Sequence, residues 1–207
     1  MENQPTETRI QTRNRTRIVD AAQEVFAERG FNGATVDRIA ELAGMSKPNL
    51  HYYFKRKSDL YYTVLERILA IWLEPLEDLD PTADPRTELE GYIRLKLLAS
   101  RDHPSASRLF ANEMLRGAPV LEPYLRTELR VLVDRKAHVI RRWISEGRLN
   151  KVDPYHLIFL IWAATQHYAD FAVQVNAVLD IPRLKNSHYD DIARSLTGII
   201  FDGIIPR

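Results

Sequence analysis

The sequence contains no cysteine. Disulfide bonds, thiol catalysis and cysteine-based zinc sites are therefore excluded. The longest apolar runs, such as residues 157–165, are far shorter than the roughly 20 residues that a membrane-spanning helix requires. Residues 1–8 are polar, include Glu2 and Glu7, and lack the apolar segment of a signal peptide. We therefore expect a cytoplasmic protein that does not enter a membrane.

The chain also has little net charge, +1 over 207 residues, but this charge is unevenly distributed. Residues 1–57 hold 10 Lys and Arg against 7 Asp and Glu, whereas residues 58–207 hold 19 against 21. The basic excess at the N-terminal end has the sign that phosphate binding requires. Hydrophobic residues make up 45% of the chain, which is enough for a substantial buried core.

Apolar residues recur with the 3.6-residue period of α-helices, and no segment shows the alternation of a strand. The pattern predicts an all-α fold of about nine helices. Side chains that can cap a helix precede the second, third and fourth of them, at Thr35, Ser46 and Ser58. The predicted ranges are about 11–29, 36–43, a short helix from 47, then 59–79, 86–102, 105–116, 121–146, 154–178 and 189–204.

Residues 35–54 are the most informative segment, because they indicate two short helices joined by a tight turn at Gly44. The second helix carries small, polar and aromatic side chains where an ordinary surface helix would carry Glu and Lys. This layout is typical of a helix-turn-helix unit, whose second helix enters the major groove of DNA. The alternative is a plain helical hairpin whose aromatic residues only pack. The residues predicted to pack the two helices together are Ile39, Ala40, Leu42, Ala43, Leu50 and Phe54.

Candidate DNA contacts surround this unit. Short or planar side chains let the helix backbone enter the groove, while Tyr, His and Lys can donate to phosphate oxygens. The outward residues of the second helix are predicted to be Lys47, Pro48, Asn49, His51, Tyr52 and Tyr53. Lys57 adds a cation at the start of the fourth helix. Arg13, Arg15 and Arg17 could grip phosphates or reach a minor groove, and solvated charge is the alternative.

The same region resembles the signature of the TetR family of one-component repressors over about residues 10–60. The resemblance implies DNA binding, an all-helical dimer and an effector pocket in a larger C-terminal domain. It implies that Thr35 and Ser46 also face DNA, and it divides the chain into a DNA-binding domain, residues 1–57, and a ligand-binding and dimerisation domain, residues 58–207. The matching residues are Phe26, Gly30, Phe31, Ala34, Thr35, Ile39, Ala40, Ala43, Gly44, Ser46, Leu50, Tyr52, Tyr53, Phe54, Lys57 and Leu60.

The C-terminal part resembles a narrower group of that family, the repressors of pyrimidine utilisation. Residues 92–96, 107–110, 156–159 and 165–171 carry this likeness. It implies a regulator of pyrimidine catabolism that releases its operator on binding uracil, thymine or a related breakdown product. Two alternatives remain open: a TetR-type regulator that senses a purine or an amino-acid-like catabolite, and a DNA-binding assembly factor without an effector.

A stripe on the eighth predicted helix has the chemistry of a pocket for such a ring. Trp162, Gln166 and Asp170 follow one another at i, i+4 and i+8. An indole can stack on a planar heterocycle, and an amide both donates and accepts hydrogen bonds, which suits the edge of uracil. Four further residues on otherwise apolar helix faces are predicted to line the same cavity: Trp72, Lys96, Phe110 and Glu113. Ordinary core packing of the tryptophans and a structural Lys96–Glu113 ion pair are the alternatives.

The chain shows no catalytic or metal-binding pattern. His156 and His167, with Asp153 and Asp170, lack the spacing of metal ligands on one helix. No Ser/His/Asp set, glycine-rich phosphate loop or paired acid is present. We therefore expect no enzyme, no metal and no cofactor other than the small-molecule effector.

The last two predicted helices carry more apolar surface than one monomer can bury. As in TetR-like proteins, we expect a homodimer through these helices. Its two recognition helices would lie about 34–36 Å apart, on a palindromic DNA operator. The fourth helix starts near DNA and reaches Trp72, so it is predicted to carry the effector signal. The expected dimer stripes are Leu157, Ile161, Tyr168 and Ala172, and Ile192, Leu196, Ile199 and Ile200.

Overall fold

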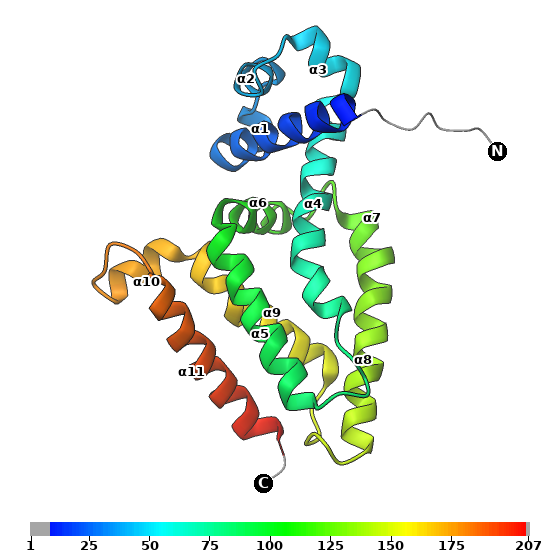
Figure 1. The fold of residues 1–207 in the computed structure, drawn as a ribbon, viewed down its shortest axis with the longest axis vertical. Coiled ribbons are helices and arrows are strands. Elements are labelled where there is room, and N and C mark those ends of the chain that lie inside the picture. Colours follow the sequence, from blue (N-terminus) through cyan, green and yellow to red (C-terminus); the bar gives the residue numbers. More distant parts are fainter. Residues whose placement is uncertain (1–8, 206–207) are drawn as a thin grey trace, which may run out of the picture.

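The structure, a computed structural model, describes residues 9–205, and most of them are helical (Figure 1). No strand occurs in this range, which confirms the all-α prediction. Residues 1–8, on which the signal-peptide argument rests, lie outside the described residues. The elements are α1 (Arg9–Gly33), α2 (Val36–Leu42), α3 (Lys47–Tyr53), α4 (Lys57–Glu77), α5 (Pro85–Asp102), α6 (Pro104–Leu115), α7 (Glu122–Tyr124), the π-helical segment η1 (Leu125–Leu129), α8 (Arg130–Ser145), α9 (Pro154–Asp170), α10 (Ala172–Val178) and α11 (Asn186–Ile204).

The helix-turn-helix forms through the local signals that the sequence predicts. The Thr35 hydroxyl caps α2 by accepting from Arg38 N at 3.2 Å, and the Ser46 hydroxyl caps α3 by accepting from Asn49 N at 3.3 Å. Gly44 makes the turn between them with a φ of 64°, in the left-handed region that favours glycine. The predicted caps at Thr35 and Ser46 are therefore confirmed.

Two local predictions are wrong, and a third is right in extent but not in detail. Ser58 does not cap α4, because that helix already begins at Lys57, with Arg56 as a cap residue that makes no side-chain hydrogen bond. The predicted helix over 154–178 breaks at Phe171, whose φ and ψ of −114° and 31° are not helical. The predicted helix over 121–146 is continuous through α7, η1 and α8, but it includes the π-helical turn η1. Apolar spacing does not locate a single irregular turn, because the stretches on either side of it each show the same 3.6-residue period.

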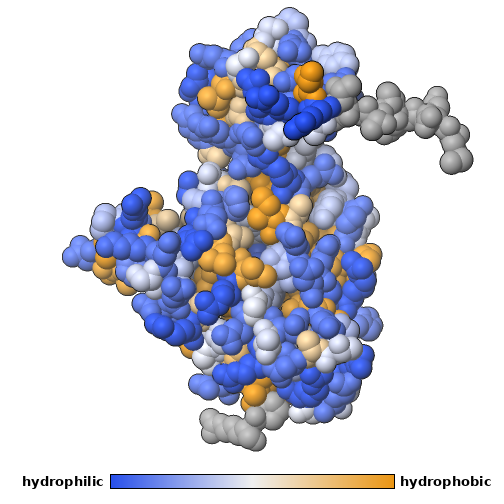
Figure 2. All heavy atoms as spheres, in the orientation of Figure 1, coloured by the Kyte–Doolittle hydropathy of each residue, from blue (hydrophilic) through white to orange (hydrophobic). Residues whose placement is uncertain are grey.

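The helices form two connected parts (Figure 1). The helices α1, α2 and α3 lie together at one end, and α4 leads from them into the larger part. There α5 packs against α9 on one side and against α11 on the other, while α1 rests on α4 and α6. Figure 2 shows a mostly hydrophilic face with apolar residues gathered over the middle of the larger part.

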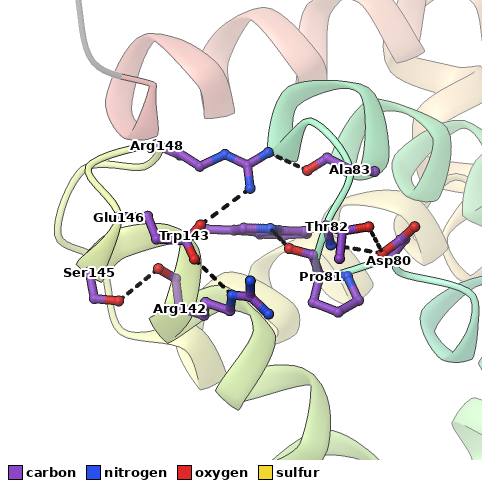
Figure 3. A network of polar contacts seen from close by, with 9 residues as sticks. All are labelled: Asp80, Pro81, Thr82, Ala83, Arg142, Trp143, Ser145, Glu146 and Arg148. Carbon is purple, nitrogen blue, oxygen red and sulfur yellow. Dashed lines mark hydrogen bonds and ion pairs between the residues drawn. The ribbon is translucent and has the colours of Figure 1, made fainter.

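The end of α8 clamps the loop between α4 and α5 (Figure 3). Trp143 is completely buried, and its Nε1 donates to the carbonyl of Pro81 at 3.0 Å. Arg148 donates to the carbonyl of Ala83 and also lies 3.4 Å from Glu146. This network fixes the far end of α4, opposite the DNA-binding helices.

Candidate DNA-binding face and effector site

The short helix α3 lies at one end of the molecule (Figure 1), and its exposed side chains are polar and aromatic. Leu50 is buried on its inner side, and the imidazole Nδ1 of half-buried His51 lies 3.3 Å from the carbonyl of Phe54. The exposed residues are Lys47, Pro48, Asn49 and Tyr52, of which Tyr52 has 63% of its surface accessible. A protruding helix of this kind can enter a major groove.

Two tyrosines tie α3 to α1. Asn14 donates to the Tyr53 hydroxyl at 3.0 Å, and Gln11 donates to the Tyr52 hydroxyl at 3.4 Å. The two rings meet edge to face with their centroids 5.2 Å apart. Both hydroxyls keep their own protons for donation, so a phosphate contact is compatible with these bonds.

The three arginines of α1, predicted as one group, differ in the structure. The Arg15 guanidinium lies 4.6 Å from the centre of the Phe54 ring, and Arg17 donates to the carbonyl of Ala43 at 2.6 Å. These two side chains therefore brace the helix-turn-helix against α1. Arg13 is exposed and keeps its predicted role as a candidate phosphate contact.

Lys57, which is predicted to add a cation near the DNA backbone, is turned inward in this structure. Its Nζ donates to the carbonyls of Phe31 and Ala34 at 2.8 and 2.9 Å, and lies 4.6 Å from the centre of the Phe31 ring. The ammonium thus satisfies carbonyls at the end of α1, as basic side chains often do at helix C-termini. The charge of a lysine and its position in the sequence do not show whether its ammonium donates to backbone carbonyls or to DNA phosphates.

The structure brings Trp72 and Lys96 together inside the larger part. Both residues are buried, and the Lys96 ammonium lies 5.5 Å from the centre of the Trp72 ring. Trp72 Nε1 and Ser100 Oγ are buried and have no hydrogen-bond partner within residues 9–205. An unsatisfied buried polar group costs about 1–3 kcal/mol, so such groups call for a partner that binds there.

The charge of this cluster depends on the pKa values of Lys96 and Asp170. Burial lowers the pKa of Lys96 to about 7, against the opposing attraction of Asp170 on α9. Burial raises the pKa of Asp170, while the hydrogen bond from Ser107 and the charge of Lys96 lower it. Ser107 Oγ donates to Asp170 at 2.5 Å. Near pH 7 Lys96 can therefore act as an ammonium donor or as an amine.

The predicted stripe on α9 borders this cluster. Trp162 is half-buried, and its Nε1 donates at 2.5 Å to the hydroxyl of buried Tyr92, one turn before Lys96 on α5. Trp162 also lines a groove of about 520 Å³ between η1, α8 and α9. Gln166 lies one turn further along α9 and is half-buried. Phe110 is half-buried and packs against the core.

Glu113 does not belong to this cluster, and no Lys96–Glu113 ion pair occurs among the described residues. Glu113 is completely buried, and its carboxylate accepts from the Tyr61 hydroxyl at 3.1 Å and from Val120 N at 2.7 Å. Sequence periodicity placed the residue correctly on an inward helix face. It could not show that this face meets the start of α4 rather than α5.

Three polar neighbours of the cluster were missed. Tyr92 and Ser100 flank Lys96 at one-turn spacing on α5, and Ser107 meets Asp170 from α6. The regular 92–96–100 spacing of polar residues on the apolar face of α5 was the signal available for the first two.

The expected dimer stripes are wrong in part. Leu157, Ile161 and Ile200 are buried within the monomer, because α9 packs on α5 and α6, and α11 packs on α5. The apolar side chains left exposed on these elements include Leu160, Phe171 and Ile199. Between α9, α10 and α11 lies an open groove of about 480 Å³, whose lining includes Tyr168, Val175, Val178, Leu179, Leu184 and Ile192.

Among residues 9–205, no three His, Asp or Glu side chains are grouped closely enough to hold a metal ion. None of the helices described combines the length and the apolar character needed to cross a bilayer.

Comparison with known proteins agrees with this architecture. Residues 18–63 match the model of the bacterial regulatory proteins of the tetR family, and residues 65–207 match that of the YcdC-like protein C-terminal region. The HTH-type transcriptional regulator RutR of Escherichia coli K12 is 48% identical over 92% of this chain and 90% of its own. The HTH-type transcriptional repressor NicS of Pseudomonas putida is 30% identical over 72% and 70%.

Solved structures show the same fold. The regulator SCO4942 from Streptomyces coelicolor has a TM-score of 0.71 at 28% identity, covering 91% of this chain and 97% of its own. AibR, solved with isovaleryl coenzyme A and operator DNA, has a TM-score of 0.67 at 18% identity, covering 90% and 97%, which shows the fold alone. The chain therefore belongs to the TetR family of bacterial regulatory proteins and is a DNA-binding transcriptional regulator, not an enzyme.

Proposed function

We propose that this regulator represses genes of pyrimidine catabolism and releases its operator when uracil, thymine or a related breakdown product binds beside Trp72 and Lys96. The observation that carries the proposal is the pair of buried polar atoms without partners, Trp72 Nε1 and Ser100 Oγ, next to a desolvated ammonium. A small ring with carbonyl and N–H groups satisfies such atoms. The resemblance to pyrimidine-responsive repressors and the 48% identity to RutR support this effector class.

The surrounding residues suit a planar, neutral, polar ligand. Trp72 and Trp162 offer aromatic faces, and the Gln166 amide can donate to a carbonyl and accept from a ring N–H. Lys96 can donate to a second carbonyl. Because its pKa is about 7, it can do so as an ammonium or as a neutral amine. Asp170, held by Ser107, completes the polar side of the cluster.

The DNA-binding form is proposed to be a homodimer through α9 and α11 on a palindromic operator. The support is the exposed apolar surface at Leu160, Phe171 and Ile199, together with the open groove beside it. A two-fold dimer of this kind presents two α3 helices to successive major grooves. Effector binding against α4 would then change the separation of the two α3 helices.

Replacing Gln166 by alanine is expected to weaken uracil binding by roughly 10- to 100-fold. The amide is proposed to make two hydrogen bonds to the ring, worth about 1–3 kcal/mol together. Isothermal titration of the purified protein with uracil, thymine and their dihydro and ureido breakdown products measures this. Gln174→Ala, an exposed glutamine on α10, is the matched control and should bind as wild type does.

The titration also separates the alternatives. Absence of heat with every pyrimidine would leave a TetR regulator with another effector. Binding of a purine such as xanthine, or of an amino acid, would identify the effector class that the sequence left open.

Replacing Lys47 by methionine is expected to weaken operator binding at low salt and to reduce its salt dependence. In the free protein Lys47 Nζ lies 2.9 Å from Asp37, an exposed pair that a phosphate can readily displace. Each lost phosphate contact lowers the slope of log affinity against log salt by about 1. Fluorescence anisotropy between 50 and 300 mM salt gives the slope. Arg142→Met removes a remote exposed charge from α8, so an equal change there would contradict a local contact.

A further inference from the structure

Glu113 is a buried carboxylate that has few polar partners. Its two oxygens accept one hydrogen bond each, from Tyr61 and from the backbone of Val120, and no cation lies within ion-pair distance among residues 9–205. Burial and the neighbouring charge of Glu113 raise the pKa of Tyr61, so the phenol keeps its proton and donates it. Loss of either donor would leave a buried carboxylate poorly satisfied.

Tyr61 connects this carboxylate to the DNA-binding helices. Its ring meets Phe26 of α1 edge to face with centroids 4.8 Å apart, and it lies 4.9 Å from the Phe31 ring. The hydroxyl of the same residue bonds to α6 of the larger part. The Tyr61 ring therefore packs in the core of the DNA-binding domain, while Glu113 of the effector domain fixes the orientation of its hydroxyl. We name Glu113, Tyr61, Phe26 and Phe31 the interdomain joint.

A second link between the two parts is more exposed. Arg67 of α4 donates to Asp20 and to Gln23 of α1, each at 2.5 Å. The Asp20 side chain is 61% accessible, so solvent and salt weaken this pair. The Glu113–Tyr61 bond is shielded from both, because it is buried. Salt and solvent therefore weaken it less than they weaken the Arg67–Asp20 pair.

We propose that Glu113 is a positioning residue for operator binding: through Tyr61 it fixes the angle at which α1–α3 sit on the effector domain. Both helices that bring these residues together also reach the effector cluster, α4 with Trp72 and α6 with Ser107. Without the bond, each DNA-binding domain rotates more freely about α4, and a dimer matches two half-sites less often. The inference rests on the proposed homodimer on a palindromic operator, but it does not depend on which effector binds.

The test compares two tyrosines that each bond to a carboxylate. Tyr61→Phe keeps the ring in the joint and removes only the hydroxyl. Tyr155→Phe is the matched control, because it removes a hydroxyl that lies 2.9 Å from Asp134, between α9 and α8, away from the joint. Affinities are measured for a palindromic duplex that wild type selects from a random library, and for a duplex of the same length with one half-site.

Tyr61→Phe is expected to lose at least about 10-fold in affinity for the palindrome and less than about 3-fold for the single half-site, since only the palindrome demands a fixed separation. Tyr155→Phe is expected to leave both affinities within about 2-fold. Equal losses on both duplexes, or no loss on either, would overturn the proposal. A urea titration of each variant shows that it remains folded at the temperature of the binding assay.

Glu113→Gln provides the conservative variant. Its amide oxygen can still accept from Val120 N, and its NH₂ group can donate to the Tyr61 hydroxyl, so the geometry of the joint is retained. Palindrome affinity within about 3-fold of wild type is expected. A loss as large as that of Tyr61→Phe would contradict a positioning role based on geometry.

Discussion

Replacing Lys96 by methionine is expected to stabilise the protein below about pH 7 and to remove a rise in stability that wild type shows above it. Burial lowers the pKa of Lys96 from 10.5 to about 7 in the folded state. Between these values the unfolded chain binds more protons than the folded one, so wild-type stability increases with pH. Below about pH 7 both states are protonated, and the folded protein carries the full cost of a buried ammonium, on the order of 3–5 kcal/mol.

The measurement is urea unfolding at fixed protein concentration from pH 6 to pH 10, for wild type and Lys96→Met. The difference between the two curves isolates this side chain, with Asp170 as the acidic group that faces it. Lys151→Met, at an exposed position, should run parallel to wild type. Parallel curves for Lys96→Met as well would mean that the ammonium is not desolvated. The same variant should bind uracil more weakly, because it lacks a donor.

Replacing Trp143 by alanine is expected to lower the free energy of unfolding by about 3–5 kcal/mol. The side chain is completely buried, and its removal also takes away the donor to the Pro81 carbonyl. At roughly 2–4 °C per kcal/mol for a chain of this size, the melting temperature should fall by about 6–20 °C. Differential scanning calorimetry measures this.

Trp143→Phe is the control for that change, because it keeps an aromatic ring and removes the N–H donor. It should lose less than half as much stability. Equal losses in the two variants would show that the hydrogen bond, and not the buried surface, holds the loop between α4 and α5. Operator binding well below the melting temperature should persist in both variants, since Trp143 on α8 bonds to the loop that follows α4. That loop lies at the end of α4 remote from α3 (Figure 1).

The features predicted best from the sequence are those that depend on residues close together in the chain. Thr35 and Ser46 cap their helices because each hydroxyl meets an N–H three residues ahead, whatever the rest of the chain does. Leu50 and Phe54 are buried as their spacing predicts. Apolar spacing does not show which side of a helix is buried when the helix is apolar on several sides. On α9 Leu157 is buried and Leu160 is exposed, and periodicity gave no reason to choose between them.

The prediction of site residues was limited in the same way. Trp72 and Lys96 stood out because they interrupt apolar faces, and the structure brings them within 5.5 Å of each other. Glu113 stood out for the same reason, yet its partner is Tyr61, 52 positions away on a different helix. A pattern along one helix shows that a polar group turns inward. Only the packing of the chain shows which group it meets.

The helix α4 belongs to both parts of the protein, and this limits how its domains can be exchanged. The predicted boundary at residue 57 would cut Leu60, Tyr61 and Val64, all buried, away from the core formed with α1. The two family models instead meet between residues 63 and 65, inside α4. A new sensor domain can therefore be recombined onto these DNA-binding helices only through a continuous helix. Each residue gained or lost at that junction would turn the whole sensor by about 100° and shift it by about 1.5 Å.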